Sequence, residues 1–293
     1  MDDSRASTRP DEIGMTEADY AVFEDYFYRK TGIHLTSAKR YFVTKRLAKR
    51  IAASGLGDFR AYFAKLRLEA SQREFQALVN EMTVNETYFF REEHQFRCLV
   101  ASILPEITAR RPGRPLKIWS TPCSTGEEPY SIAIYLLEHW PGLAQHDVTL
   151  IASDIDTDVL AAARRGSYAE RAFQNLPAAI RARHFDPPRN GLSRISEQLL
   201  ESVEFLKVNL IAPPPRLQAQ DIDVVFCRNL LIYFDQAAQR QAVEAIATAL
   251  RPGGFVLLGH SESMSRISSL FAVRRFADGI VYQKPLEGPD HGA

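Results

Sequence analysis

The hydrophobic and polar positions divide the chain into two parts with different periods. From Glu17 to Thr83, apolar residues recur at intervals of three and four, which is typical of amphipathic helices. After Leu116, short apolar runs alternate with helical patterns, as they do in proteins with a parallel sheet. We therefore predict a small all-α domain followed by an α/β domain.

The first part predicts only helices. Thr16 and Asp19 have the spacing of a capping box, which indicates where the first helix begins. Residues 1–14 are polar and charged, and we expect them to form a disordered tail before a helical domain at 15–84. The expected helices are Glu17–Thr31, Ser37–Ser54, Asp58–Leu68 and Gln72–Thr83.

The second part predicts five parallel strands and an antiparallel edge hairpin, which together make a doubly wound, Rossmann-like sheet. We expect a junction and linker helix at 85–111 and the α/β domain at 112–293. Residues 167–202 interrupt the alternation, and we interpret them as an inserted small β subdomain. The expected strands are Leu116–Trp119, Val148–Ser153, Val203–Leu210, Ile222–Phe226 and Phe255–Gly259, with the hairpin at Phe271–Phe276 and Ile280–Lys284.

The segment from Leu116 to His139 predicts a strand, a sharp turn and a helix, and such a turn is a natural ligand site. Gly126 would let the main chain approach a ligand closely. Glu127 and Glu128 occupy the start of the helix, where they would repel a phosphate. A ligand with hydroxyls and positive charge fits better, such as an adenosyl group with an ammonium and a sulfonium. The alternative is that both carboxylates only complement the helix dipole.

Asp154 ends the second predicted strand. In α/β nucleotide-binding folds, an acid at this position accepts hydrogen bonds from ribose hydroxyls. An ordinary surface turn is the alternative. Polar residues also follow the strand Ile222–Phe226, beginning with Cys227, Arg228 and Asn229. The sequence therefore places several polar groups at the carboxyl edge of the sheet.

The second predicted helix carries a concentration of positive charge. Its apolar stripe consists of Val43, Leu47 and Ile51. The opposite face holds Phe42 with Lys39, Lys45, Arg46, Lys49 and Arg50. This face could dock an acidic partner or could simply be solvated. Nucleic acid is a weaker alternative, because the chain has 36 basic and 36 acidic residues and formal net charge +0.

Composition limits the remaining classes of protein. A length of 293 residues suggests about two domains. Cys98, Cys123 and Cys227 are scattered, so we expect neither a disulfide framework nor a metal site. We expect no signal peptide or membrane span, because Met1–Pro10 is polar and no apolar run is long enough. We therefore expect a cytoplasmic protein that does not insert into a membrane.

Four motifs in order carry a family resemblance. They are Asn-Glu-Thr-Tyr-Phe-Phe-Arg from residue 85, Ser-Thr-Gly-Glu-Glu-Pro-Tyr-Ser from 124, Ala-Ser-Asp-Ile-Asp from 152, and Phe-Cys-Arg-Asn-Leu-Leu-Ile-Tyr-Phe from 226. Over about residues 15 to 285 the chain resembles the CheR family of chemoreceptor glutamate methyltransferases. The resemblance implies a helical N-terminal domain, a domain that binds S-adenosylmethionine, and an inserted β subdomain. It also implies methyl transfer to glutamate carboxylates.

By matching positions, the resemblance also implies roles for individual residues. Apart from the matched positions, Arg91 and Tyr233 are our candidates to orient the substrate carboxylate, with a purely structural role as the alternative for both. The basic face Lys39, Lys45, Arg46, Lys49 and Arg50 would dock the receptor. Between the two adjacent acids, we expect Glu128 rather than Glu127 to contact the cofactor. The expected cofactor contacts are Asn85, Thr87, Arg91, Glu128, Asp154, Asn209, Leu210, Asn229 and Leu230.

The expected partners are cytoplasmic helices of methyl-accepting chemoreceptors, and we expect a monomer that does not bind nucleic acid. The turn at Pro187–Ile195 looks short for gripping a tethering peptide, so we expect action without a tether. Two other classes stay open. One is a methyltransferase acting on nucleic acid or a small molecule, against which stands the absence of an Asn-Pro-Pro-Tyr-type motif. The other is a non-catalytic module that senses the cofactor.

Overall fold

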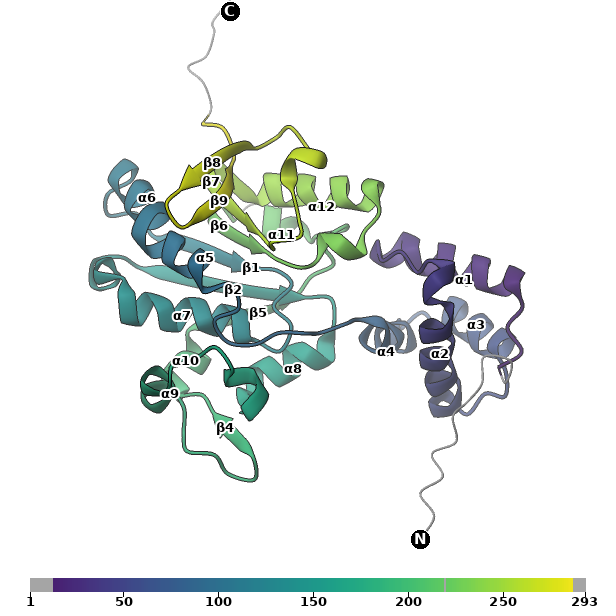
Figure 1. Cartoon of the computed structure of the whole chain (residues 1–293). Helices are drawn as coiled ribbons and strands as arrows, with labels where there is room; N and C mark the ends of the chain where they lie inside the picture. The colour runs from purple at the N-terminus through teal and green to yellow at the C-terminus, as the bar shows by residue number, and fades with distance from the viewer. Residues whose placement is uncertain (1–12, 219, 287–293) are drawn as a thin grey trace, which may run out of the picture. The chain divides into compact units, whose positions relative to one another are not determined.

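The computed structural model describes residues 13–218 and 220–286, so most of the tail expected at 1–14 lies outside the described residues. The chain divides into two compact units. The first comprises the residues up to Val84 together with Tyr233–Asp235, and the second comprises Asn85–Ile232 and the residues from Gln236 onward (Figure 1). The first unit thus takes in a short segment from far along the sequence.

The first unit is all-α apart from one isolated bridge, as the sequence predicted. The capping box is present, because Thr16 Oγ1 accepts a hydrogen bond from Asp19 N at 3.1 Å. Ile13 is buried, so packed structure begins before the end of the expected tail. Phe23 and Phe27 pack with Phe59 in an aromatic core. The helices are α1 (Glu17–Thr31), α2 (Arg40–Ser54), α3 (Phe59–Leu68) and α4 (Arg73–Met82).

The second unit contains a seven-stranded sheet in the order β5-β2-β1-β6-β7-β9-β8. Five strands are parallel and the last two form an antiparallel edge hairpin, which confirms the predicted fold class. The central strands are buried on both faces. The strands are β1 (Leu116–Ser120), β2 (Val148–Asp154), β5 (Val203–Lys207), β6 (Ile222–Cys227), β7 (Leu250–Leu258), β8 (Ala272–Phe276) and β9 (Gly279–Gln283).

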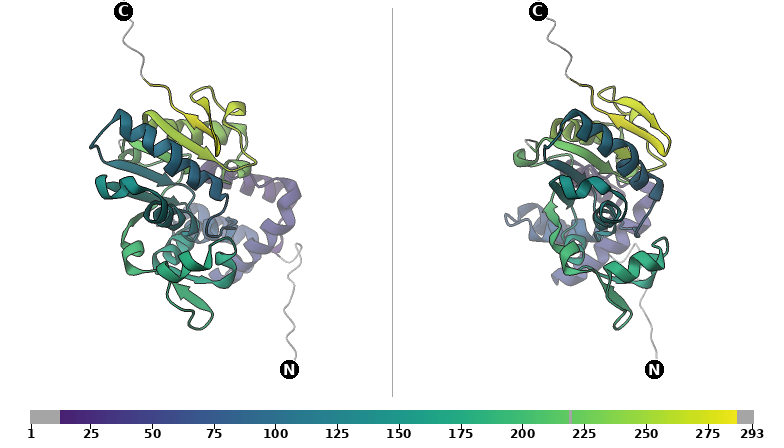
Figure 2. Two further views of the ribbon diagram at one scale, coloured as in Figure 1. Left: turned by 60° about the vertical axis from the view of Figure 1, so that its left-hand side comes forward. Right: turned by 90° about the vertical axis from the view of Figure 1, so that its left-hand side faces the viewer.

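Helices cover both faces of this sheet (Figure 2). The principal ones are α5 (Glu93–Cys98), α6 (Leu104–Arg110), α7 (Glu127–His139), α8 (Thr157–Arg165), α11 (Pro215–Gln218) and α12 (Gln236–Ala249). A π-helical turn at Leu99–Ile103 joins α5 to α6. Within 13–218 and 220–286, no helix is both long and apolar enough to span a membrane.

The segment between α8 and β5 forms the inserted subdomain. Its two-stranded antiparallel sheet consists of β3 (Ser167–Ala169) and β4 (Leu192–Arg194), with helices α9 (Ala178–His184) and α10 (Glu197–Glu201). Phe89 stacks on Phe173 at 5.5 Å between ring centroids, and Phe89 N donates to Ala172 O at 2.9 Å. The subdomain therefore packs against the segment that starts the second unit.

Candidate functional site

Polar side chains gather where three neighbouring parallel strands end. In the register of the sheet, Ser120 on β1 lies beside Ala152 on β2 and Phe226 on β6. Asp154, the last residue of β2, and Arg228, directly after β6, therefore lie at the same edge as the turn after β1. This is the edge at which open α/β sheets bind ligands.

The turn after β1 is fixed by main-chain hydrogen bonds to β2. Cys123 N donates to Ser153 O at 2.8 Å, and Ser124 N donates to Asp154 Oδ2 at 2.9 Å. Gly126 has a φ of 96°, and a Cβ there would lie 2.9 Å from Ala163 Cβ. We predicted that Gly126 gives a ligand room, whereas the structure shows that close protein packing already requires a glycine.

Asp154 is buried, and both of its carboxylate oxygens accept hydrogen bonds from main-chain N–H groups. Besides Ser124 N, it accepts a hydrogen bond from Asp156 N at 3.0 Å. Burial outweighs these bonds and raises the pKa of Asp154 to about 6. Because the folded pKa lies above the unfolded value, the ionised carboxylate opposes stability at neutral pH. The two carboxylate oxygens can together accept about four hydrogen bonds, so Asp154 retains capacity for a ligand hydroxyl beside its bonds from the main chain.

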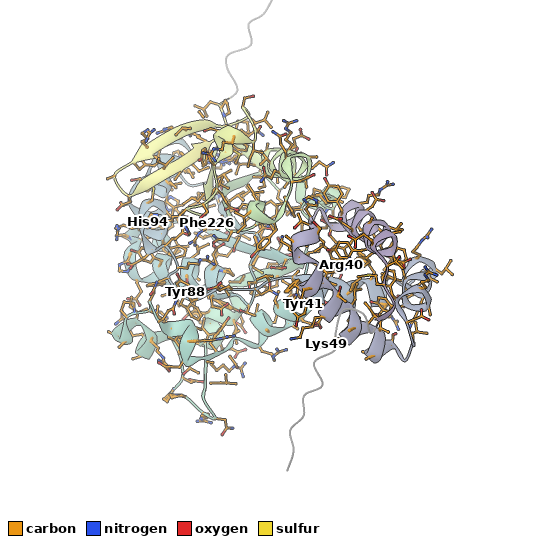
Figure 3. The ribbon with its side chains drawn as sticks, turned by 45° about the vertical axis from the view of Figure 1, so that its right-hand side comes forward. Arg40, Tyr41, Lys49, Tyr88, His94 and Phe226 are labelled. Atoms are coloured by element: carbon orange, nitrogen blue, oxygen red, sulfur yellow. The ribbon has the colours of Figure 1, made fainter. Side chains whose placement is uncertain are left out.

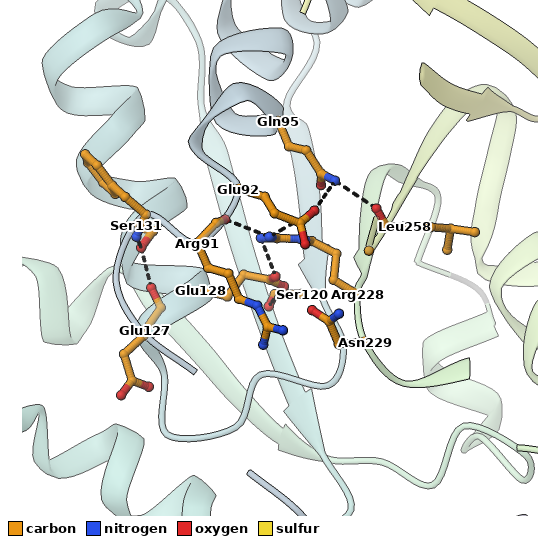
Figure 4. A network of polar contacts seen from close by, with 12 residues as sticks. Arg91, Glu92, Gln95, Ser120, Glu127, Glu128, Ser131, Arg228, Asn229 and Leu258 are labelled. Atoms are coloured by element: carbon orange, nitrogen blue, oxygen red, sulfur yellow. Dashed lines mark hydrogen bonds and ion pairs between the residues drawn. The ribbon is translucent and has the colours of Figure 1, made fainter. Parts of the chain in front are cut away.

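Glu128, at the start of α7, belongs to a buried network (Figure 4). Its Oε1 accepts a hydrogen bond from Ser120 Oγ at 2.7 Å, and its Oε2 accepts one from Arg228 Nη1 at 3.0 Å. Burial raises the pKa of Glu128, and Arg228 acts in the opposite direction by favouring the ionised form. The network thus supports a carboxylate at the carboxyl edge of the sheet.

Arg228 connects three elements from a position that is only 4% exposed. Its Nη2 donates to Arg91 O at 2.6 Å and lies 3.5 Å from Glu92 Oε2. Burial acts to raise the pKa of Glu92, but Arg228 and His260 hold it below its ordinary value. Arg228 therefore joins the end of β6, the start of α7 and the segment before α5.

Glu127 lies apart from this network, with its carboxylate turned away from Arg228 in Figure 4. Its Oε2 accepts a hydrogen bond from Thr125 Oγ1 at 2.6 Å, and burial raises its pKa. Its main-chain oxygen accepts a hydrogen bond from Ser131 Oγ, which in turn accepts one from Phe90 N at 3.0 Å. The preference for Glu128 over Glu127 as the cofactor contact stays a prediction.

The candidate residues of the junction lie in the second unit. Asn85 Nδ2 donates to Asp156 Oδ2 at 3.0 Å, which ties the junction to the end of β2. Arg91 Nη1 donates to Glu86 O at 2.8 Å, and Thr87 is partly buried. The structure therefore links the Asn85 side chain to the end of β2, whereas the Arg91 side chain bonds within the junction and only its main-chain oxygen contacts Arg228.

The remaining cofactor candidates follow β5 and β6. Asn209 Oδ1 accepts a hydrogen bond from Ile211 N at 3.3 Å, and Leu210 is buried. Asn229 has a left-handed φ of 57° and is partly buried, as is Leu230. All of these positions lie at the edge of the sheet that carries Asp154 and Glu128.

Tyr233 belongs to the first unit. Its main-chain oxygen accepts a hydrogen bond from His34 N at 3.3 Å, and Lys39 Nζ lies 5.8 Å from the centroid of its ring. Two residues further on, Asp235 Oδ1 accepts a hydrogen bond from Tyr28 OH at 2.8 Å. The two catalytic candidates, Arg91 and Tyr233, are therefore held by different units.

The basic face of α2 is partly occupied by contacts within the first unit. Arg50 makes two hydrogen bonds to the Glu74 carboxylate, each 3.0 Å long. Arg46 Nη1 donates to the main-chain oxygens of Glu81 and of Thr83 at the end of α4. Arg46 and Arg50 therefore fasten α2 to α4, which the sequence analysis did not foresee.

The exposed part of this face is smaller than its sequence suggests, because Arg46 and Arg50 are only partly exposed. Figure 3 labels Tyr41 and Lys49 on this helix. Arg46 stacks on Phe42 with 3.8 Å between its guanidinium carbon and the ring centroid. The exposed aromatic is Tyr41, which is 60% exposed. Among the described residues Lys45 has no ion pair or hydrogen bond, whereas Lys49 Nζ lies 2.8 Å from Glu81 Oε2.

Three residues of the site were not among our candidates. Arg228 was named among the polar residues that follow the strand Ile222–Phe226, but it was given no role in the site. Glu92 and Glu262 gave no such indication, because each contacts the site from a segment distant in sequence. Within the described residues, no cluster of metal-ligating side chains occurs.

The edge of the sheet carries buried and partly buried carboxylates, and its buried arginine is already paired with Glu128 and Glu92. These carboxylates are hydrogen-bond acceptors, so they suit the ammonium and hydroxyls of S-adenosylmethionine, which donate, rather than a phosphate. The family models agree: residues 85–279 match "CheR methyltransferase, SAM binding domain", and residues 18–83 match "CheR methyltransferase, all-alpha domain". The protein is an S-adenosylmethionine-dependent methyltransferase. The chain belongs to the CheR family.

Curated relatives match nearly the whole chain. Chemotaxis protein methyltransferase 2 of Vibrio cholerae is 49% identical over 94% of this chain and 96% of its own length. Chemotaxis protein methyltransferase 2 of Pseudomonas aeruginosa is 40% identical over 88% and 91%. Chemotaxis protein methyltransferase of Escherichia coli is 36% identical over 90% and 91%. This chain is therefore similar to these enzymes across both units.

Proposed function

We propose that this protein transfers the methyl group of S-adenosylmethionine to glutamate side chains of chemoreceptors, forming glutamate methyl esters. The observation that carries the proposal is the similarity, over both units, to relatives named chemotaxis protein methyltransferase. Two units are relevant, because one would hold the cofactor and the other would dock the receptor. We expect the enzyme to act in the cytoplasm on receptor helices.

The chemistry requires no general base. A glutamate carboxylate has an ordinary pKa near 4.3 and is already an anionic nucleophile at neutral pH. Its oxygen forms a bond to the methyl carbon as the carbon–sulfur bond breaks, and the sulfonium leaves as the neutral thioether S-adenosylhomocysteine. The enzyme therefore needs mainly to align the three reacting atoms. Such alignment can supply roughly 7–11 kcal/mol of the barrier.

We propose that Arg91 and Tyr233 orient the substrate carboxylate. Arg91 is partly buried, and its guanidinium carbon lies 5.7 Å from the centroid of the Tyr88 ring, which favours one orientation of the side chain. We assign cofactor contacts to Glu128, Asp154 and Asn229. The proposed set is completed by Asn85, Thr87, Arg91, Asn209, Leu210 and Leu230.

We place receptor docking on the exposed side of α2. Receptor methylation helices are rich in Glu and Gln, so an exposed lysine face would complement them. Lys45 supports this assignment most directly, because it is exposed and Tyr41 precedes it by one helical turn. Arg46 and Arg50 contribute to docking only indirectly, by holding α2 in place.

The test is methyl incorporation into soluble receptor fragments with their methylation glutamates intact or replaced by glutamine. We expect label in the intact fragments that base releases as methanol, and little label in the replaced fragments. Equal incorporation into both, or preferential incorporation into nucleic acid, would contradict the substrate assignment. Binding of S-adenosylhomocysteine without methylation of any intact fragment would instead favour a sensing module.

A further inference from the structure

The loop after β6 has a main-chain conformation that needs support. Asn229 has a φ of 57°, in the left-handed region that residues other than glycine seldom adopt. Asparagine tolerates this region better than most residues, but the conformation persists only where neighbouring structure holds it. The loop includes Asn229 and Leu230, two of the proposed cofactor contacts.

A single side chain from another segment supplies that support. Glu262, which follows β7, accepts hydrogen bonds from Asn229 N at 2.8 Å and from Gly259 N at 2.9 Å on Oε2. Its Oε1 accepts a hydrogen bond from Leu231 N at 2.7 Å. One carboxylate therefore accepts hydrogen bonds from main-chain N–H groups of two loops, the one after β6 and the one after β7. These N–H groups lie beyond the ends of the strands, where strand pairing does not provide an acceptor.

Close packing at Gly259 holds the same loop from the other side. A Cβ on Gly259 would lie 2.8 Å from Asn229 Nδ2 and 3.0 Å from both Asn229 N and Glu262 Oε2. These distances leave no room for a methyl group. Any side chain at residue 259 would therefore displace Asn229, the carboxylate of Glu262, or both.

We propose that Glu262 is a positioning residue for the cofactor, because it fixes the main chain from Asn229 to Leu231 and thereby presents Asn229 and Leu230. This inference rests on the proposed function, which assigns those two residues to cofactor binding. Glu262 itself need not touch the cofactor. Its contribution is to set the loop conformation before the cofactor arrives, which lowers the entropy lost on binding.

A carboxylate at residue 262 does not serve the stability of the folded chain, but it does fix the loop after β6. Burial raises its pKa, while the hydrogen bonds from Asn229 and Gly259 act to lower it. Since the folded pKa lies above the unfolded value, the charge opposes folding at neutral pH. Glutamine would remove that unfavourable charge, but it has only one acceptor oxygen and would leave at least one N–H group without an acceptor. We therefore expect the substitution to affect binding more than stability.

The experiment is calorimetric titration of the full chain with S-adenosylhomocysteine. We expect Glu262→Gln and Gly259→Ala each to raise Kd by about 10- to 100-fold, as loss of fixed hydrogen bonds predicts. The matched control is Asp223→Asn, because Asp223 is a carboxylate that likewise accepts a main-chain hydrogen bond, from Lys117 N at 2.8 Å, near the opposite end of β6. Its Kd should stay within about twofold of wild type, whatever its melting temperature.

The outcomes separate this inference from the proposed function. If the wild-type chain fails to bind S-adenosylhomocysteine, the proposed function fails and this inference fails with it. If the wild-type chain binds, Asn229→Ala weakens binding, and Glu262→Gln binds as wild type does, only the positioning role is overturned. Should Glu262→Gln fail to fold, Gly259→Ala decides: unchanged affinity overturns the role, and weakened affinity supports it.

Discussion

The carboxyl edge of the sheet and the basic face of α2 both carry many charged residues, yet they use them differently. At the sheet edge, the buried Arg228 is bonded to Glu128, whose side chain is only 12% exposed. On α2, Arg50 is paired with Glu74 of the same unit, while Lys45 is exposed. The sheet edge thus has a fixed arrangement of charge, whereas α2 divides its charges between fold and surface.

This difference shows that residue type alone does not tell which charges are free for a partner. Arg46 and Lys45 are adjacent in sequence, but Arg46 donates to main-chain oxygens at the end of α4 and Lys45 does not. A charge that already has partners acts mainly on structure, and an exposed one acts through a screened field. Mutations at both regions can therefore separate stability from recognition.

The largest effect should come from Arg228→Met at the sheet edge. Removing one partner of a buried ion pair costs about 3–5 kcal/mol, because Glu128 and Glu92 lose their compensating charge. Chemical denaturation should show this loss of stability. Without Arg228 the pKa of Glu128 should rise further, so affinity for S-adenosylhomocysteine should fall more steeply in the variant as pH is lowered from 8 to 6.

The control for this variant is Arg251→Met, because Arg251 is buried and paired with Asp223 in the same unit. We expect a comparable loss of stability in the control, with cofactor affinity retained by the folded protein. If Arg228→Met binds the cofactor as tightly as wild type at every pH, the buried network does not serve the site.

Next in size should be Arg50→Glu on α2. The change places a second carboxylate beside Glu74, where the ion pair is only partly exposed, and should cost about 2–4 kcal/mol in free energy of unfolding. Lys49→Glu breaks the more exposed contact with Glu81, and we expect a loss of about 1 kcal/mol or less. Denaturant melts of the two variants would contradict this division if they coincided.

Asp154 should give an intermediate effect that concerns the cofactor. Asp154→Ala removes the acceptor proposed for ribose and for Ser124 N, and should weaken S-adenosylhomocysteine binding by about 1–3 kcal/mol in a titration. Because the pKa of Asp154 is raised to about 6, its ionisation reduces stability as pH rises through 6. The stability of Asp154→Asn relative to wild type should therefore improve as pH rises from about 4 to just above 6, and level off beyond that. A flat difference would show that Asp154 does not titrate in this range.

The smallest effect should be Lys45→Glu. An exposed charge contributes about 0.2–1 kcal/mol, so KM for the receptor fragment should rise by up to about fivefold and its salt dependence should flatten. Lys65→Glu on α3 is the matched control, because Lys65 is also exposed in the same unit. If the receptor kinetics of Lys45→Glu are unchanged at every salt concentration, the basic face of α2 does not dock the receptor. The inserted subdomain would then be the favoured site of receptor recognition.

The sequence predicted elements whose periodicity is local and missed boundaries that depend on distant partners. Helix α1 has the predicted bounds, because its caps are encoded by neighbouring residues. Strand β5 ends at Lys207 rather than Leu210, because its neighbour β2 ends at Asp154 and a turn begins at Asn209. Strand β7 begins at Leu250, before its predicted start at Phe255. The register between β6 and β7 shifts between these two residues of β7.

The same limit applies to the site. Asp154 and Asn229 could be placed at the sheet edge, because strands and their ends are local patterns. The hydrogen bond between Arg50 and Glu74 joins residues 24 positions apart, and the one between Asn229 and Glu262 joins residues 33 positions apart. No periodicity encodes such pairs, so tertiary structure was needed to distinguish bonded charges from free ones.

The segment Tyr233–Asp235 has a consequence for how this protein can be divided. Phe234 forms an isolated bridge with Ile33. Three residues that interrupt the sequence of the second unit therefore belong to the first unit. Cutting the chain after Val84 would separate that bridge's two halves onto different pieces. Neither fragment would then contain all the residues of the first unit. A chimera that takes its residues up to Val84 from a relative would therefore also need that relative's residues at 233–235.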